Sequence, residues 1–328
     1  MKKLLFGIQG TGNGHISRCI PIIEELKTQG YQVDILLSGI SYELKLPFAV
    51  KYRKKGLSYV FGKEGGINLF QTLLRCNLAR LIYEIIKCPV KQYDCVISDF
   101  EPIVAWASKI KRKKCIGFGN QYAAKVYPIK TESFQEKLGI LFLNHFAPVK
   151  DSIKYDYLQN PHQNTYLPSF NLESLKEKSN SDHIVIYLPA HSLRSLKEIA
   201  SQFPQKSFKA FCKWAKKELE PLPNLKISPI CTSFKKEITN AQKVITAAGF
   251  GLTSELIGLQ KDMLVIPMKN QVEQKINAAK LKKLGYSIIK NHRQFTIIEQ
   301  WLLGKRTPQK LPHSTSAEIT KKLIAIAS

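Results

Sequence analysis

The sequence lacks paired cysteines, a long apolar run and a full share of acidic residues, and each absence excludes a class of protein. Its seven cysteines form no Cys-x-x-Cys pair and lie mostly inside apolar runs, which predicts reduced core thiols and argues against disulfides or a zinc site. No stretch approaches the roughly 20 apolar residues that a membrane-spanning helix needs. The apolar start of the chain stops at Gly7, too early for a signal peptide. A cytoplasmic protein is therefore expected.

Acidic residues number 25 against 50 lysines and arginines, which leaves a formal net charge of +25. A charge of this size attracts nucleic acid, anionic lipid or a phosphorylated substrate, and it does not choose among them. No RNA-binding signature accompanies it, so nucleic acid is the least favoured partner. The densest basic runs, residues 51–55 and 109–114, are also typical of solvated helix ends.

The length of 328 residues predicts two domains. Short β-like runs alternate with amphipathic stretches from residue 3 to about residue 146, and the alternation restarts at residue 184. This pattern is typical of a parallel sheet that helices cover on both faces. The stretch from about Ala147 to Asp182 loses the periodicity and is rich in polar residues, Pro and Asn, which predicts a linker. The fold class is therefore α/β, with two doubly wound sheets.

A glycine-rich loop, GTGNGH, directly follows the first expected strand and opens the first helix. Its glycines, Gly10, Gly12 and Gly14, allow a ligand to approach the backbone, and the N–H groups at a helix start suit an anion or a polar sugar. The spacing is G-x-G-x-G, and no acidic residue ends the second strand. A dinucleotide is therefore a weak interpretation of this loop.

His15 ends this loop at the carboxyl end of the first strand, where an α/β fold gathers ligand groups. An imidazole titrates near neutral pH and can take a proton from an alcohol, although a histidine here can also simply bond its own loop. Asp99 falls at the corresponding end of the CVIS strand, where it either orients the imidazole or caps the next helix. The two residues form a candidate catalytic dyad, with Glu101 as the next candidate base.

Residues 244–287 read as a strand, a Gly-rich turn, a helix, a second strand, a polar loop and a second helix. This segment resembles the donor-binding region of the GT-B nucleotide-sugar glycosyltransferases. It is similar to the type that adds N-acetylglucosamine to the lipid intermediate of peptidoglycan and to the wider UDP-glycosyltransferase group.

The resemblance implies a donor site in the second domain. In that family a Gly-rich turn offers N–H groups to the diphosphate, and an acid one helical turn on holds the ribose. The matching residues are Gly249, Gly251, Thr253, Ser254 and Glu255. An acid and a glutamine before an Asn-Ala pair hold the donor sugar, and they match Glu273 and Gln274, followed by Asn277.

Two further positions match more loosely. Arg194 matches an arginine near the phosphates, although Pro189 and Ala190 replace the glycines before it. Phe234 corresponds to an aromatic residue near the base. Ala247 and Ala248 stand where many relatives carry a side chain that contacts phosphate.

The first loop resembles the acceptor side of the same family. The resemblance implies an acceptor loop that comprises Gly10, Gly12, Asn13 and Gly14, with His15 as general base and Asp99 as its partner. It also implies two facing Rossmann-like domains with a cleft between them. Residues 1–165 would bind the acceptor and residues 166–313 the donor, and a helix in residues 314–328 would pack back on the first domain.

The activity implied is inverting transfer of a sugar from a nucleotide diphosphate sugar, UDP-linked above others, to a hydroxyl of a glycan or lipid-linked acceptor. The chain has no Asp-x-Asp motif and no cluster with metal-ligand spacing, so we expect no metal and no cofactor besides the nucleotide sugar as co-substrate. Two alternatives stay open. One is a UDP-sugar 2-epimerase of the same architecture, and the other is a non-catalytic binder of nucleotide sugar or nucleic acid.

Two apolar stretches with basic flanks, residues 65–88 and 138–146, are either ordinary core or an interfacial patch. In the second case the net charge would draw the protein to an anionic membrane surface, where a lipid-linked acceptor is within reach. The expected location is then peripheral, on the inner face of the membrane.

Overall fold

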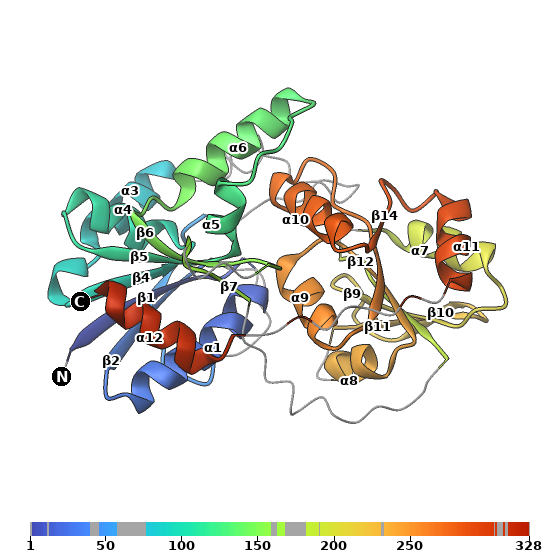
Figure 1. The fold of residues 1–328 in the computed structure, drawn as a ribbon, viewed down its shortest axis with the longest axis horizontal. Coiled ribbons are helices and arrows are strands. Elements are labelled where there is room, and N and C mark those ends of the chain that lie inside the picture. Colours follow the sequence, from blue (N-terminus) through green and yellow to red (C-terminus); the bar gives the residue numbers. More distant parts are fainter. Residues whose placement is uncertain are drawn as a thin grey trace. The chain divides into compact units, whose positions relative to one another are not determined.

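The computed structural model describes most of the chain, as two compact α/β units (Figure 1). The described residues are 2–11, 13–39, 46–57, 77–158, 163–167, 182–189, 191–230, 233–304, 306, 311 and 314–327, with only the backbone described at residues 13 and 233. The first unit takes the described residues up to 167 together with 314–327, and the second takes those from 182 to 311. Each unit has a sheet of its own.

The described strands of the first sheet are all parallel and run in the order β3-β2-β1-β4-β5-β6-β7. They are β1 (Lys3–Gln9), β2 (Gln32–Ser38), β3 (Tyr52–Lys54), β4 (Cys95–Asp99), β5 (Cys115–Gly119), β6 (Asp151–Tyr155) and β7 (Thr165–Tyr166). The order reverses between β1 and β4, where Ile8 pairs with Asp99. In a sheet of this kind, ligands bind at the carboxyl ends of the strands beside such a reversal.

Helices cover the two faces of this sheet (Figure 1). They are α1 (Asn13–Thr28), α3 (Leu78–Lys87), the 3-10 helix η1 (Val90–Gln92), α4 (Pro102–Ile110), α5 (Asn120–Lys125), α6 (Phe134–Phe146) and α12 (Ser316–Ala327). Strands that are covered on both faces need apolar residues without a break, and β1 is buried from Leu4 to Gln9. The last helix of the chain, α12, packs against α1 and contacts β6, so the C-terminal segment belongs to the first unit.

Two strands of the first sheet lie where the sequence predicts a linker. β6 and β7 both fall between Ala147 and Asp182. Ile153 and Tyr155 of β6 are buried, but they alternate with polar residues, and the connection to β7 is polar. The linker prediction is therefore wrong for these two strands, because a short strand with few apolar residues gives a weak periodic signal.

The second sheet has the strand order β10-β11-β9-β8-β12-β13-β14 among its described strands. They are β8 (Ile184–Tyr187), β9 (Phe208–Cys212), β10 (Leu219–Leu222), β11 (Leu225–Pro229), β12 (Lys243–Thr246), β13 (Asp262–Val265) and β14 (Ser287–Ile288). The pairs are parallel except for β10 and β11, which are antiparallel. The order reverses between β8 and β12, so this unit also has a switch point.

The helices of the second unit alternate with its strands, except that β9, β10 and β11 follow one another without a helix between them. They are α7 (Leu193–Gln202), α8 (Ser233–Asn240), α9 (Phe250–Gly258), α10 (Val272–Lys283) and α11 (Phe295–Leu303). One core cluster joins the sheet to α7 and α11, with Ile186, Leu196 and Ile298 all fully buried. Both units are thus doubly wound α/β folds, as the sequence predicts.

The described cysteines agree with the prediction of free thiols in the core. The five that the structure describes are free thiols, of which Cys115 is half-buried and the others are buried. Cys76 and Cys231 lie outside the described residues. Among the described helices, none combines the length and the apolarity that spanning a membrane requires.

Candidate functional site

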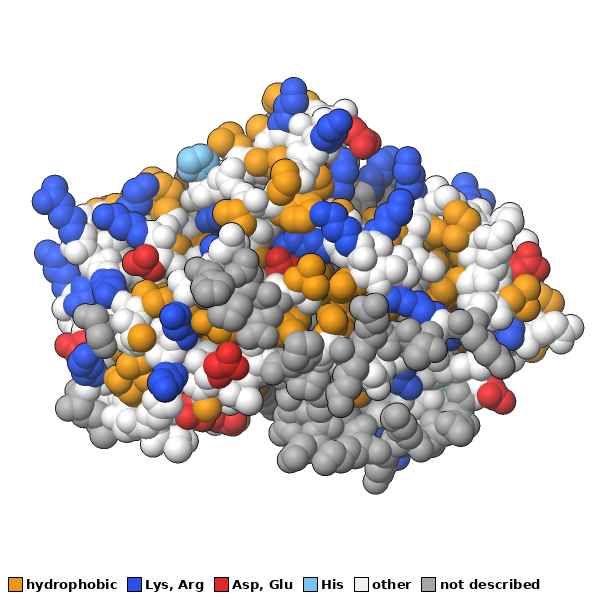
Figure 2. All heavy atoms as spheres, viewed as in Figure 1, with side chains coloured by type: hydrophobic (Ala, Val, Ile, Leu, Met, Phe, Trp, Pro, Cys, Tyr) orange, Lys and Arg blue, Asp and Glu red, His pale blue; other side chains and the backbone are white. Residues whose placement is uncertain are grey.

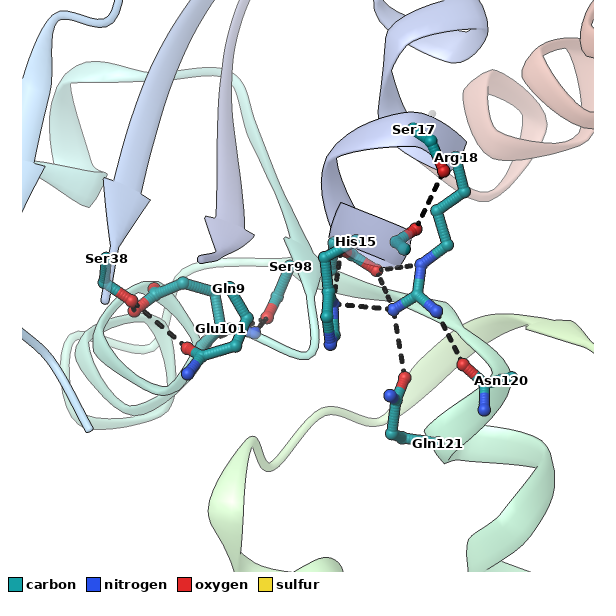
Figure 3. A network of polar contacts seen from close by, with 11 residues as sticks. Gln9, His15, Ser17, Arg18, Ser38, Ser98, Glu101, Asn120 and Gln121 are labelled. Carbon is teal, nitrogen blue, oxygen red and sulfur yellow. Dashed lines mark hydrogen bonds and ion pairs between the residues drawn. The ribbon is translucent and has the colours of Figure 1, made fainter. Parts of the chain in front are cut away.

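His15 lies in a network of polar contacts in the first unit (Figure 3) and is in direct contact with Asp99. His15 Nδ1 lies 2.8 Å from Asp99 Oδ2. His15 projects from the first turn of α1 and Asp99 is the last residue of β4, so α1 and β4 bring the two side chains together at the carboxyl edge of the sheet. The His15 side chain is 13% exposed and that of Asp99 is fully buried. A carboxylate at Nδ1 orients the ring and leaves Nε2 for a ligand.

The turn after β4 directs the Asp99 carboxylate toward α1. Phe100 has a backbone φ of 50°, a conformation that residues other than glycine rarely adopt. Glu101 then caps α4 and accepts hydrogen bonds from Ile103 N at 3.0 Å and from Val104 N at 2.7 Å. The helix cap is therefore Glu101, which leaves Asp99 to orient His15.

Glu101 itself is engaged elsewhere. It is fully buried, and its Oε1 also accepts a hydrogen bond from the Ser38 hydroxyl at 2.7 Å, which in turn contacts Gln9 (Figure 3). Burial raises the pKa of Glu101 to about 7, against the backbone and Ser38 hydrogen bonds that lower it. With both oxygens committed to α4 and Ser38, Glu101 is a structural cap in this geometry.

Arg18 is the charged side chain beside His15 and Asp99 that the sequence reasoning missed. It follows His15 by three residues on α1, and its Nε and Nη2 lie 2.8 Å and 2.5 Å from Asp99 Oδ1. Nη1 donates to Asn120 Oδ1 at 2.5 Å and Nη2 donates to Gln121 Oε1 at 3.0 Å, both at the start of α5. The i, i+3 spacing placed Arg18 on the same helix face as His15 and was the available signal.

A glycine gives the Arg18–Asp99 pair its space. Gly119, the residue before α5, has a φ of 123°. A Cβ at this position would lie 2.8 Å from Arg18 Nη2 and 3.0 Å from Asp99 Oδ1. Both the backbone conformation and the close approach therefore require glycine here.

The environment of Asp99 keeps the carboxylate ionised. Burial opposes the charge, but the Arg18 guanidinium and the His15 imidazole outweigh it and hold the pKa of Asp99 below its usual range. A charged carboxylate against Nδ1 is the partner that stabilises an imidazolium when the ring takes up a proton.

The glycine loop lies beside this pair. Gly10 N donates to Ser38 O at 2.5 Å, and the Ser17 hydroxyl donates to Gly14 O at 3.4 Å. Gly12 and the side chain of Asn13 lie outside the described residues. An acceptor-binding role for this loop stays a prediction.

In the second unit, the predicted donor turn joins β12 to α9. Gly249 is the N-cap residue of α9, and Gly251 lies in its first turn. The Thr253 hydroxyl donates to Gly249 O at 2.8 Å, so Thr253 holds the turn. The Ser254 hydroxyl is buried and has no hydrogen-bond partner among the described residues.

Glu255 follows on the same helix. Its carboxylate forms no hydrogen bond or ion pair with the residues that the structure describes, and burial raises its pKa while Lys235 opposes the shift. A half-buried carboxylate in this state has acceptor capacity for a ligand hydroxyl.

Residues of α10 hold the same turn in place. Gln274 Oε1 accepts hydrogen bonds from Ala248 N at 3.1 Å and from Met268 N at 2.9 Å. Asn277 Nδ2 donates to Ala248 O at 3.0 Å. Both polar groups of the Ala248 backbone are thus bonded to Gln274 and Asn277. The sequence reasoning assigned these two side chains to donor binding. Glu273 is half-buried next to them.

The two loosely matched positions lie on other elements of the second unit. The Arg194 side chain is 83% exposed and its Nε donates to Glu198 Oε1 at 3.0 Å along α7. Phe234 packs against Tyr187 and Phe211, with ring centroids 5.0 Å and 4.9 Å away. Ala190, in the loop before α7, lies outside the described residues.

Comparison with known proteins gives one family and one fold. A family model described as glycosyl transferase family 1 matches residues 2–304. No curated protein matches the sequence. Among solved structures, MurG of Acinetobacter baumannii is 13% identical with a TM-score of 0.56, over 100% of this chain and 99% of that chain. UGT89C1 of Arabidopsis thaliana, complexed with UDP, is 13% identical with a TM-score of 0.53, over 99% of each chain.

A third structure, the glycosyltransferase SnogD of Streptomyces nogalater, is 13% identical with a TM-score of 0.53, and the match covers 99% of this chain and 99% of that chain. At these identities the structures support the GT-B fold alone. The family model, which matches most of the chain, shows that the activity is glycosyl transfer. The chain is a glycosyltransferase that belongs to glycosyl transferase family 1.

Proposed function

We propose that the enzyme transfers a sugar from a UDP-sugar to an acceptor hydroxyl with inversion at the anomeric carbon, and that His15 is the general base. The observation that carries this proposal is the contact of His15 Nδ1 with the ionised Asp99 at 2.8 Å. A base that is oriented in this way needs no covalent intermediate, because the acceptor oxygen itself can attack the donor.

The chemistry balances with these groups. The acceptor hydroxyl gives its proton to His15 Nε2 while its oxygen forms the new bond to the anomeric carbon. The bond from that carbon to the diphosphate oxygen breaks, and UDP leaves with the electron pair. Asp99 stabilises the imidazolium, and N–H groups at the start of α9 stabilise the charge on the leaving diphosphate. The proposal includes no metal and no cofactor other than the co-substrate.

Three observations support UDP-sugar as the donor. Gly249, the N-cap residue of α9, provides no side-chain cap, and the N-terminus of a helix suits a diphosphate. Glu255 has acceptor capacity for ribose hydroxyls. UGT89C1, whose fold this chain shares, has been crystallised with UDP and with UDP-L-rhamnose.

The proposed acceptor is a glycan or lipid-linked hydroxyl, reached from an anionic membrane surface. Support comes from the net charge of +25 and from α3. Four apolar side chains of α3 are each more than half exposed: Leu78, Ile82, Tyr83 and Ile86. We call these four residues the α3 stripe.

The test is release of UDP from UDP-sugars with and without a panel of glycan and lipid-linked acceptors. Acceptor-dependent release is expected of a transferase, whereas a 2-epimerase converts the donor without an acceptor and a non-catalytic binder leaves it intact. His15→Ala should lower turnover by a factor on the order of 10²–10⁴, the range for loss of a general base. Asp99→Asn should fall between this variant and the wild type. Full activity in His15→Ala would refute the assignment of the base.

A further inference from the structure

We propose that Arg18 prevents the His15–Asp99 pair from taking up an extra proton at neutral pH, so that Nε2 of His15 stays free to act as the base. The inference rests on the proposed function, because it concerns the base of that same site. Arg18 contacts both members of the pair and acts on the acceptor only through them, so it is a positioning residue.

A buried carboxylate beside an imidazole strongly favours proton uptake. The Asp99 side chain is fully buried, and its Oδ2 lies 2.8 Å from His15 Nδ1. An opposite charge this close stabilises the charged form of a titratable group by about 1–3 pH units. An extra proton would either occupy Nε2 of His15 or neutralise Asp99, which could then no longer stabilise an imidazolium. Either form disables the base.

Arg18 places a positive charge equally close to the ring (Figure 3). Its Nη2 lies 2.8 Å from His15 Nδ1, which is also the distance from Asp99 Oδ2 to that nitrogen. A guanidinium does not lose its proton in proteins, so this charge is present at every relevant pH. Opposite charges at equal distances nearly cancel in their effect on the ring.

The net charge of the three groups leads to the same conclusion. With Arg18 ionised, Asp99 ionised and His15 neutral, the charges sum to zero, and an extra proton would give the group a net positive charge. Without Arg18, the same proton would instead remove a net negative charge. Burial favours the state with less net charge, so Arg18 reverses the preference of the pair.

The position of the three side chains makes these charges effective. The Arg18 side chain is 9% exposed and that of His15 is 13% exposed, so salt and water screen their interaction little. The start of α5 holds the guanidinium in place, because Nη1 donates to Asn120 Oδ1 and Nη2 donates to Gln121 Oε1.

Two other titratable groups near Asp99 are neutral. They are the Cys19 thiol of α1 and the Tyr122 phenol of α5, and burial raises the pKa of each well above its ordinary value. Within the described part of the chain, the charged groups in contact with His15 are therefore Arg18 and Asp99.

Two ionisable groups on the neighbouring helices are bonded away from the base. Glu101, at the start of α4, accepts the hydrogen bond of Ser38. Lys125 of α5 has its Nζ 4.8 Å from the centroid of the Tyr122 ring, and this nitrogen donates to Ala147 O at 3.2 Å. The proton balance of the base thus depends on the Arg18 charge.

The test measures proton uptake by His15 in the full chain without substrate. Nuclear magnetic resonance of ¹⁵N-labelled histidine follows the ring across pH, and His15→Gln identifies its signals. Arg18→Met removes the charge and should move the midpoint of proton uptake to higher pH by at least about one unit. Arg18→Lys retains a positive charge and should titrate closer to the wild type than to Arg18→Met.

Lys27→Met is the matched control. Lys27 is an exposed residue in the last turn of α1, so this variant removes one positive charge from the same helix at a distance from the pair. Its His15 should titrate as in the wild type, because solvent and salt screen exposed charges that lie far apart.

A double variant tests the proposal even if Arg18→Met fails to fold, since that change leaves Asp99 buried without its cation. Arg18→Met with Asp99→Asn removes both charges and leaves neither of them unpaired. Its midpoint should lie close to that of the wild type, because two effects that cancel are lost together. If Arg18 had no effect on the ring, this variant would titrate at least about one unit below the wild type.

The transfer assay gives a second readout. A base must be unprotonated to react, so the acid limb of kcat/KM in Arg18→Met should move to higher pH with the midpoint. On this limb each unit of displacement lowers kcat/KM about tenfold, and the loss should be recovered as the pH rises. A purely structural role of Arg18 would lower kcat/KM at every pH.

The proposal is overturned if Arg18→Met titrates as the wild type does, if Lys27→Met shifts the midpoint equally, or if the double variant titrates a unit or more below the wild type. Because proton uptake is measured without substrate, it also separates the two proposals. A titration that responds as expected in a protein that transfers no sugar would support the role of Arg18 and refute the proposed function.

Discussion

Asp99 is a fully buried carboxylate that stays ionised, and its neighbours explain how. Breaking a buried ion pair by removing one partner is strongly destabilising, whereas the intact pair adds little to stability. A buried Arg18–Asp99 pair is therefore better explained by what it does for His15 than by what it does for the fold. The lowered pKa of Asp99 adds stability above its unfolded pKa, and this stability is lost as the pH falls through the folded pKa.

Sequence reasoning reached part of this site. His15 and Asp99 are predictable because both follow directly from strand ends, and the carboxyl ends of adjacent parallel strands meet at one edge. Arg18 was missed because helical spacing gives a shared face and no partner. Arg18 bonds to Asn120 and Gln121, which lie about 100 residues later in the sequence. Only the folded sheet brings these two residues next to Arg18.

Glu255 carries the residue-scale prediction for the donor. Glu255→Gln should weaken UDP binding by at least about 1.5 kcal/mol, the order of a lost charge-assisted hydrogen bond. Isothermal titration calorimetry with UDP measures the change. Glu299→Gln on α11, which removes an exposed acid of the same unit, is the control and should bind UDP as the wild type does. Unchanged UDP affinity in Glu255→Gln would remove the ribose assignment.

At the scale of elements, the turn between β12 and α9 owes its position to α10. Gln274 and Asn277 bond both backbone groups of Ala248, so a change in α10 acts on the donor turn through the backbone. The sequence predicts this turn and both helices, because glycine and helical periodicity are strong local signals. It does not reveal the hydrogen bonds between them, because they join residues that are 26 and 29 positions apart.

The strands that the sequence reasoning missed are short or polar. β10, for example, spans Leu219–Leu222 and pairs antiparallel at the edge of the second sheet. An edge strand is covered less than a central one, so its apolar alternation is weak. The central strands β1, β4, β8 and β12 are mostly apolar runs bounded by turns, which is the pattern that sequence reasoning detects best.

The cap of α4 gives an element-scale prediction about pH. The pKa of Glu101 is about 7 in the folded protein and about 4.3 in an unfolded chain. The folded state therefore binds more protons than the unfolded state between these values. The stability that Glu101 contributes is therefore fully present below about pH 4.3 and is lost as the pH rises through about 7.

Glu101→Gln keeps a capping oxygen and cannot ionise. Its free energy of unfolding should fall less than that of the wild type between pH 5 and pH 8, by an amount up to about 3 kcal/mol. Urea unfolding of both proteins at several pH values measures the difference, and other titrating groups cancel in the comparison. Parallel stability curves for the two proteins would show that Glu101 is not a protonated cap.

At the scale of the whole molecule, the fold was predictable because the same pattern occurs twice. Each unit alternates apolar strands with amphipathic helices, and each reverses its strand order beside a glycine-containing loop. What the sequence could not show is which apolar segments are core. Of the two stretches that suggested a membrane patch, residues 65–76 lie outside the described residues, and α6 divides its apolar residues between core and surface. Leu143 and Phe146 are buried, whereas Leu141 is exposed.

The α3 stripe is the better candidate for a docking surface. The opposite side of α3 packs on α4 through Ile85, so the stripe faces away from the core. Lys111 donates to Ile86 O and Cys88 O at the end of α3, both at 2.6 Å, which places a basic residue beside the stripe. Lysine and arginine side chains are also scattered over the face in Figure 2.

Charge decides what this surface binds. A second copy of the chain would bring another net charge of +25 against the first, which opposes self-association. An anionic lipid surface complements the positive charge, and each basic residue near the surface contributes about 1 kcal/mol of binding free energy. The α3 stripe can be buried at the boundary between the headgroups and the acyl chains. Binding should therefore be reversible and should weaken as salt rises, because ions screen exposed charges.

Co-sedimentation with vesicles tests this proposal. The protein should pellet with phosphatidylglycerol vesicles at low salt and stay in the supernatant with phosphatidylcholine vesicles or at high salt. Ile82→Glu, which places a charge in the middle of the α3 stripe, should reduce the bound fraction severalfold. Leu303→Glu introduces the same charge at an exposed leucine of the second unit and should bind as the wild type does. Equal losses in both variants would mean that net charge alone drives binding, and no binding to anionic vesicles at low salt would exclude a membrane role for the stripe.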